Sequence, residues 1–174
     1  MKMTEFNLKK NSADIGLKLG TLIFIISALL YLYDIEYITN GLLSGVSIFL
    51  TLGFGVYSIF NGRKLNQQII SFKNAFTAYF LCIVVGYLVV SVGDIIIFQF
   101  VDPEAGKILN EELMIQTKNQ YETWQMPADQ ISMQLENMQN YPRYSYFSVF
   151  MNYIFILLIN AFVGLFPAFI LKKS

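Results

Sequence analysis

One long apolar stretch constrains what this chain can fold into more than any other feature. Between Asn74 and Val101 the sequence carries a single charged residue, Asp94, and the stretch ends at Asp102-Pro103. About 18 or more apolar residues almost without charge are typical of a membrane-spanning helix, because hydrocarbon offers backbone groups no hydrogen-bond partner except each other. At a rise of about 1.5 Å per residue the stretch is about 40 Å long, enough to cross a bilayer with tilt.

The composition agrees with a membrane protein of one domain. Hydrophobic residues make up 55% of the 174 residues and charged residues 14%, whereas a soluble domain carries about 25% charged residues. A soluble fold of this length could not bury that excess of apolar surface, so lipid is the expected solvent. The formal net charge is zero, which argues against nucleic acid as a partner.

Missing residue types exclude several kinds of chemistry. The chain has no histidine, which excludes histidine-ligated haem, the common zinc sites and Ser-His-Asp catalysis. Its one cysteine, Cys82, cannot form an intramolecular disulfide and leaves no thiol pair for exchange. We therefore expect a non-enzymatic protein with no catalytic residues, no metal site and no cofactor.

Four apolar runs predict four membrane spans in a single domain covering residues 1–174. The predicted spans are residues 15–33, 41–60, 74–101 and 144–171. The first run is too long for the core of a signal peptide and has no small-x-small cleavage site, so we expect it to be retained, with Lys18 reaching toward the headgroups. Residues 34–40 are a short link, and Asn61-Gly62-Arg63-Lys64 reads as a turn.

Basic residues predict the orientation of these spans. Nine of the twelve lysines and arginines would lie on one side of the membrane, and three on the other, at Lys107, Lys118 and Arg143. Cytoplasmic segments carry the excess of Lys and Arg. We therefore expect a multi-pass protein of the bacterial inner (cytoplasmic) membrane, with both termini cytoplasmic and segment 102–143 periplasmic.

The polar segment 102–143 carries signals for two helices. Asp102-Pro103-Glu104 combines a capping carboxylate, proline at the first helical position and an acid in the first turn. A second start comes at Pro127-Ala128-Asp129. The sequence thus predicts amphipathic helices over about 103–125 and 128–140, which form an extramembrane hairpin between spans three and four. The expected apolar positions are Leu109, Leu113, Tyr121, Trp124, Ile131, Leu135 and Met138.

Short sequence pieces, taken in order, resemble a family of small bacterial membrane proteins, the domain of unknown function 4199. These pieces are Gly-Leu-Lys-Leu-Gly at 16–20, Ile-Ser-Phe-Lys-Asn-Ala-Phe at 70–76, Phe-Val-Asp-Pro at 100–103, the Met- and Gln-rich segment 114–139, and Ala-Phe-Ile-Leu-Lys-Lys at 168–173. The resemblance implies four spans and a bacterial inner membrane. It implies no activity and no catalytic residues. Asp94 and the tyrosine-rich segment 141–146 are not features of the family pattern.

Asp94 is the residue most open to a functional role. A carboxylate inside a membrane is costly, about 2.5–3.5 kcal/mol on insertion scales, and usually faces the bundle interior or water. Counting from the outer boundary places Asp94, Asn152, Ser27 and Ser47 at a similar depth, about 10 Å below the surface. They would form a polar layer that keeps the acid neutral if dry or binds a cation if wet. Alternatively, Asp94 is hydrated near the outer face or bonded to one serine.

Small residues at four-residue spacing predict close helix packing, with Gly16, Gly20, Gly55, Gly86 and Gly164 as the main positions. This packing either lies within the monomer or forms a seam between copies.

Three functions compete at this point. The first is a non-enzymatic accessory, assembly or interaction protein that binds a membrane-protein partner or a second copy through the outer hairpin. The second is a small oligomeric transporter or channel that uses Asp94. A membrane enzyme is the third, although the chain offers few acid–base groups.

Overall fold

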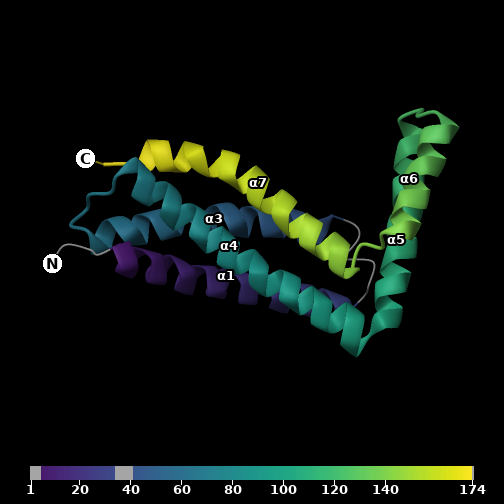
Figure 1. Cartoon of the computed structure of the whole chain (residues 1–174), viewed down its shortest axis with the longest axis horizontal. Helices are drawn as coiled ribbons and strands as arrows, with labels where there is room; N and C mark the ends of the chain where they lie inside the picture. Colours follow the sequence, from purple (N-terminus) through teal and green to yellow (C-terminus); the bar gives the residue numbers. More distant parts are fainter. Residues whose placement is uncertain (1–4, 34–40, 174) are drawn as a thin grey trace.

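Long helices dominate the architecture of the computed structural model, which describes residues 5–33 and 41–173 (Figure 1). The four longest helices are α1 (Glu5–Tyr33), α3 (Leu42–Leu65), α4 (Phe72–Ile95) and α7 (Tyr146–Leu171). Lys2 and the predicted link 34–40 lie outside the described residues.

Each of these four helices is long and apolar enough to cross a membrane. The candidate spans are Asn7–Tyr33, Leu42–Leu65, Phe72–Val101 and Tyr146–Leu171. The third includes η1 (Ile96–Val101), a π-helical continuation of α4. The prediction of an all-helical chain with four spans is therefore confirmed at the level of helix number, length and composition.

The predicted turn at Asn61-Gly62-Arg63-Lys64 is wrong, because α3 continues as a helix to Leu65. Gly62 is buried, and a Cβ there would meet the side chain of Leu8 on α1. Asn61 donates a 2.9 Å hydrogen bond to the side chain of Asn11. Thus the polar ends of α1 and α3 pack as helices beyond the apolar runs, and α1 begins at Glu5 instead of Ile15.

Helix α4 is the centre of the bundle and contacts α1, α3 and α7. Its fully buried Tyr79 packs between Gly55 of α3 and Gly164 of α7, and its hydroxyl donates a 3.2 Å hydrogen bond to Asn160 of α7. Because glycine has no side chain, Gly55 and Gly164 leave room for the ring of Tyr79. Close packing at these glycines therefore joins helices of one chain.

The remaining predicted packing glycines lie where α1 approaches α4. A Cβ on Gly16 would meet the backbone carbonyl of Cys82, and a Cβ on Gly20 would meet that of Gly86. Backbone atoms cannot move aside as a side chain can. The α1–α4 contact therefore depends on the absence of side chains at both α1 positions.

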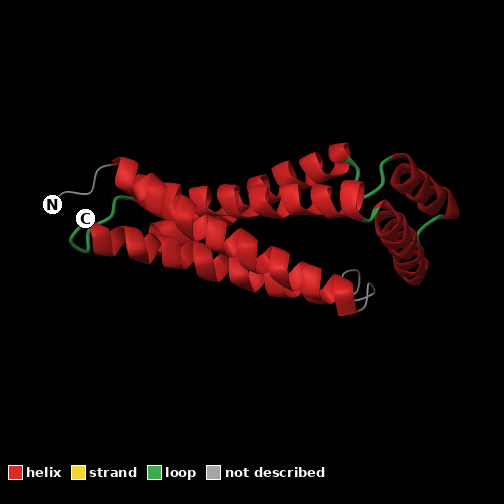
Figure 2. Cartoon of the chain, turned by 90° about the horizontal axis from the view of Figure 1, so that it is seen from below, coloured by secondary structure: helices red, strands yellow, loops and turns green. Residues whose placement is uncertain are grey.

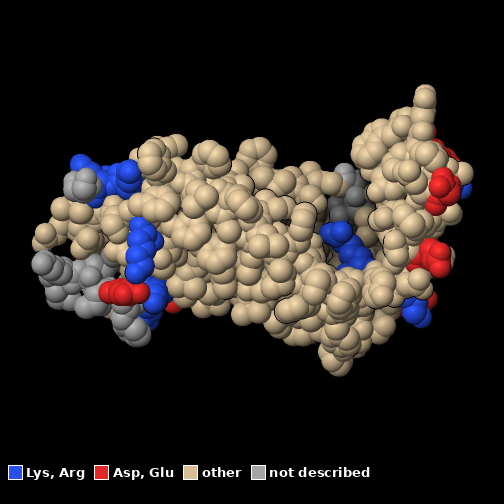
Figure 3. Space-filling model, turned by 45° about the horizontal axis from the view of Figure 1, so that its top comes forward, with Lys and Arg blue, Asp and Glu red and all other residues tan. Residues whose placement is uncertain are grey.

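The two described chain ends and the α3–α4 turn lie together at one end of the bundle (Figure 1). Ile70, just before α4, and Lys173, just after α7, exchange two backbone hydrogen bonds of 2.9 Å. Most of the visible Lys and Arg side chains gather at this end, whereas acidic side chains are prominent at the opposite end (Figure 3).

Two further helices, α5 (Pro103–Thr123) and α6 (Ala128–Asn140), stand across that opposite end (Figures 1 and 2). The Asp102 carboxylate caps α5 by accepting a 3.0 Å hydrogen bond from the backbone N–H of Ala105, as the sequence predicts. Leu109 and Ile131 are buried, but Trp124 is 62% exposed and does not lie on a buried face. The long helices diverge toward this end (Figure 2).

Candidate functional site

A polar cavity lies among the four long apolar helices, in the half of the bundle nearest α5 and α6. Its volume is about 270 Å³. All four long helices contribute to its lining, together with Arg143 and Tyr144 from the segment just before α7. The cavity is therefore lined by elements far apart in the sequence.

All four residues of the predicted polar layer line this cavity. Ser27 comes from α1, Ser47 from α3, Asp94 from α4 and Asn152 from α7. Four different helices thus bring these side chains to one space. The cavity also holds polar side chains that the sequence analysis did not select, namely Ser44, Ser91 and Tyr87.

Arg143 is the most important residue that the sequence analysis missed. Its positive charge acts electrostatically on Asp94, whereas the sequence predicts no basic partner for this acid. Its backbone N–H donates a 3.0 Å hydrogen bond to the side chain of Asn110, which is buried in α5. The available signal was the position of Arg143, directly before the predicted fourth span.

The start of α7 is fixed against the end of α4 by two contacts. Gln99 of η1 donates a 2.7 Å hydrogen bond from its side chain to the carbonyl of Tyr144. The rings of Phe98 and Tyr144 pack with their centroids 4.1 Å apart, and Tyr31 meets Phe98 edge-on. This aromatic cluster holds Tyr144 and the neighbouring Arg143 at the cavity.

Asp94 and Arg143 line the same cavity without forming a direct ion pair. The three ion pairs that the described residues form all lie on helix surfaces, between residues three or four positions apart. Within the described part of the chain, no hydrogen bond ends at the Asp94 carboxylate. The site thus holds an acid and a base that share one cavity without pairing with each other, and the Arg143 side chain interacts with Tyr144.

A second cavity, of about 360 Å³, adjoins the first beneath α5 and α6. Arg143 and Asn152 line both cavities, so the two spaces meet at these residues. The second lining is also polar, with Asn110, Gln120 and Gln134 among its residues. Polar residues therefore line a path from α5 and α6 to Asp94.

Comparison with known protein families gives a match that covers nearly the whole chain. Residues 15–173 match the family described as Protein of unknown function (DUF4199). The chain belongs to this family. The match covers all four apolar helices and the segment that contains α5 and α6, so the DUF4199 region includes both cavities. No curated protein and no solved structure matches the chain.

Proposed function

We propose that this DUF4199 protein is a non-enzymatic protein of the bacterial inner membrane that binds a protein partner through α5 and α6. In this arrangement both termini are cytoplasmic, and α5 and α6 form a periplasmic amphipathic hairpin. The concentration of basic side chains at the end with the termini supports this orientation. In this role the protein is an accessory or assembly subunit, whose membrane helices anchor and orient the outer hairpin.

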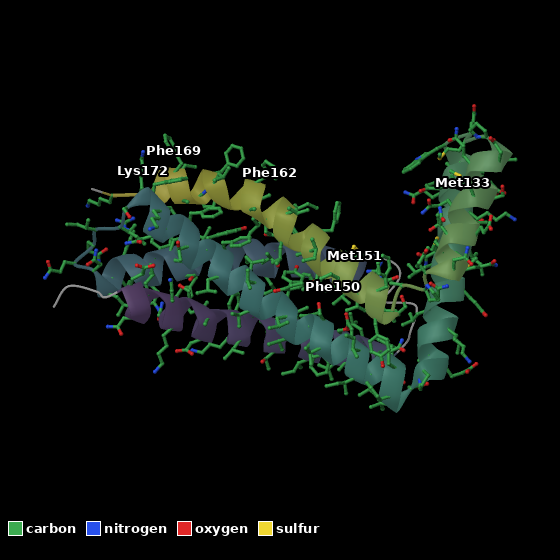
Figure 4. All side chains as sticks on the ribbon, viewed as in Figure 1. Met133, Phe150, Met151, Phe162, Phe169 and Lys172 are labelled. Carbon is green, nitrogen blue, oxygen red and sulfur yellow. The ribbon has the colours of Figure 1, made fainter. Side chains whose placement is uncertain are left out.

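The observation that carries the proposal is the separation of α6 from the membrane helices. Among the described elements, α6 packs on α5 alone, and α5 packs on α6 and η1. Trp124 and Met133, the latter on α6 (Figure 4), are 62% and 61% exposed although both are large and apolar. Tryptophan carries much of the binding energy in protein interfaces because it buries a large surface with little loss of conformational freedom. The outer hairpin therefore offers an anchor that the other described residues leave uncovered.

Site-specific photo-crosslinking in the native membrane tests this function. We expect a photoreactive residue at position 124 or 133 to give a discrete adduct with one partner, whereas the same residue at Glu111, an exposed acid on α5, gives none. The variant Trp124→Ala should weaken co-purification of that partner from gently solubilised membranes. Co-purification without any repeated partner, and without an adduct at either position, would contradict the proposal.

A small oligomeric transporter or channel is the second candidate, and the cavity around Asp94 favours it. An acid at a polar cavity within a membrane bundle is the arrangement through which many transporters couple protons to substrates. The test is Asp94→Asn in sealed vesicles, with Asp129→Asn on the surface of α6 as the matched control. Proton-coupled flux that survives Asp94→Asn unchanged would end this idea.

A further inference from the structure

The charges in the polar cavity are arranged to bind a ligand that carries both signs. Asp94 and Arg143 contribute opposite charges to one space of about 270 Å³ and make no direct ion pair. A carboxylate inside a membrane is costly unless a proton, a cation or a basic group neutralises it. Since Arg143 does not close onto Asp94, the space between them is left for a group that satisfies both.

Neutral polar side chains complete the lining. Within the described part of the chain, the side chains of Ser27, Ser44, Ser91 and Asn152 make no hydrogen bond, and all four line this cavity. Serines in membrane helices can bond to the carbonyl one turn earlier, as Thr51 does with Ser47 at 2.6 Å. The cavity serines do not use this option, so their hydroxyls remain available to a ligand.

The position of Arg143 gives the ligand a direction. Arg143 lines both the membrane cavity and the cavity beneath α5 and α6, whereas Asp94 lines the membrane cavity alone. A ligand with its anionic group on Arg143 and its cationic group on Asp94 would therefore reach inward from the outer end of the bundle. An arginine fork suits the oxygens of a phosphate, which accept two parallel N–H bonds.

We propose that this cavity binds a small zwitterion with a primary ammonium and a phosphate, the ammonium at Asp94 and the phosphate at Arg143. The proposal goes beyond partner binding by α5 and α6 and does not depend on it. The cavity volume of about 270 Å³ lies just below the range of about 300–1,000 Å³ that is typical of drug-sized ligands. It therefore suits a smaller molecule, of the size of a lipid headgroup. Two sources share this chemistry, the headgroup of an ethanolamine phospholipid and free phosphoethanolamine.

Binding measurements on the purified full-length protein distinguish the two sources. In one arm, native mass spectrometry in detergent counts retained lipids from an equimolar mixture of phosphatidylethanolamine, phosphatidylcholine and phosphatidylglycerol. In the other arm, calorimetry measures the binding of free phosphoethanolamine. We expect preferential retention of phosphatidylethanolamine, saturable binding of phosphoethanolamine, or both. No preference in the first arm together with no binding in the second overturns the proposal.

Two variants with matched controls test whether Asp94 binds the ammonium group and Arg143 the phosphate group. Asp94→Asn should weaken binding of the ammonium ligand about tenfold or more while leaving the binding of an anionic lipid unchanged, and Arg143→Gln should weaken both. The controls are Asp129→Asn on α6 and Lys107→Gln on α5, two exposed charges that line neither cavity. A single symmetric peak in size-exclusion chromatography and an unchanged helical circular-dichroism spectrum establish that each variant is folded. If one cavity variant fails this check, the other decides. Folded cavity variants that bind as tightly as the controls would overturn the assignment.

Discussion

The hydroxyl of Tyr31, near the end of α1, donates a 2.6 Å hydrogen bond to the carboxylate of Asp102, 71 positions later in the chain. The same carboxylate caps α5 through the backbone N–H of Ala105. One acid therefore ties α1 to the start of α5. Both hydrogen bonds, with that of Tyr31 the stronger influence, hold the pKa of Asp102 below its ordinary value.

Tyr31→Phe should lower the midpoint of thermal unfolding in detergent by about 2 °C at pH 7. A carboxyl whose pKa is lowered by folding stabilises the folded state above its unfolded pKa of about 3.9, and this contribution is lost as the pH falls through the lowered value. The difference from wild type should therefore shrink below about pH 4. Tyr146→Phe, at an exposed tyrosine, is the control. A difference that is the same at every pH would contradict this account.

Gly20→Ala should destabilise the bundle by about 1–3 kcal/mol, the usual cost of overpacking. The added Cβ would meet the backbone carbonyl of Gly86, and α1 would have to move away from α4. Gly53→Ala is a matched control, because a Cβ on Gly53 has no atom within 4 Å among the described residues. Chemical unfolding in mixed micelles measures both. Equal effects of the two substitutions would show that the α1–α4 approach is not the cause.

Asn110→Ala should loosen the junction between α6 and α7. The Asn110 side chain accepts the 3.0 Å hydrogen bond from the Arg143 backbone and donates a 3.3 Å bond to the carbonyl of Met138. Losing both bonds at a buried position costs about 1–3 kcal/mol. Amide hydrogen exchange over residues 138–143 should become about tenfold faster, whereas Asn119→Ala, at an exposed position on α5, should leave it unchanged. Unaltered exchange in Asn110→Ala would contradict the bridging role.

A membrane-impermeant thiol reagent tests the orientation in intact cells. A cysteine at Lys118 should be labelled at once, and a cysteine at Lys64 only after the inner membrane is opened. Both positions are exposed. The native Cys82 is fully buried and serves as an internal control that stays unlabelled. Labelling of position 64 from outside would reverse the proposed topology.

The residues explain which parts of this fold can be predicted from sequence. Hydropathy locates the lipid-facing lengths of the helices, and Asp102-Pro103 and Pro127 mark the starts of α5 and α6 closely. Hydropathy does not locate the polar ends of α1 and α3. The bond between Asn11 and Asn61 and the contact of Leu8 with Gly62 depend on which helices become neighbours.

The same distinction applies to the cavity. Counting residues predicts the common depth of Asp94, Asn152, Ser27 and Ser47, because a helix rises by a constant amount per residue. It does not predict Arg143, which is positioned by Asn110 from a helix that lies outside the membrane spans. A long-range bond of this kind leaves no periodic pattern in the sequence.

The contacts of Tyr79 join a helix that is synthesised early, α4, to one that is synthesised later, α7. The tyrosine ring is fully buried in the first third of the apolar helix Phe72–Val101, but the amide oxygen that accepts its hydrogen bond belongs to Asn160 of α7, which is synthesised after α4. Until α7 is inserted, the nascent protein holds a hydroxyl in the bilayer without this acceptor. The packing around Tyr79 is therefore complete only once α7 joins α4, and a product truncated before α7 would lack both Asn160 and the Gly164 contact.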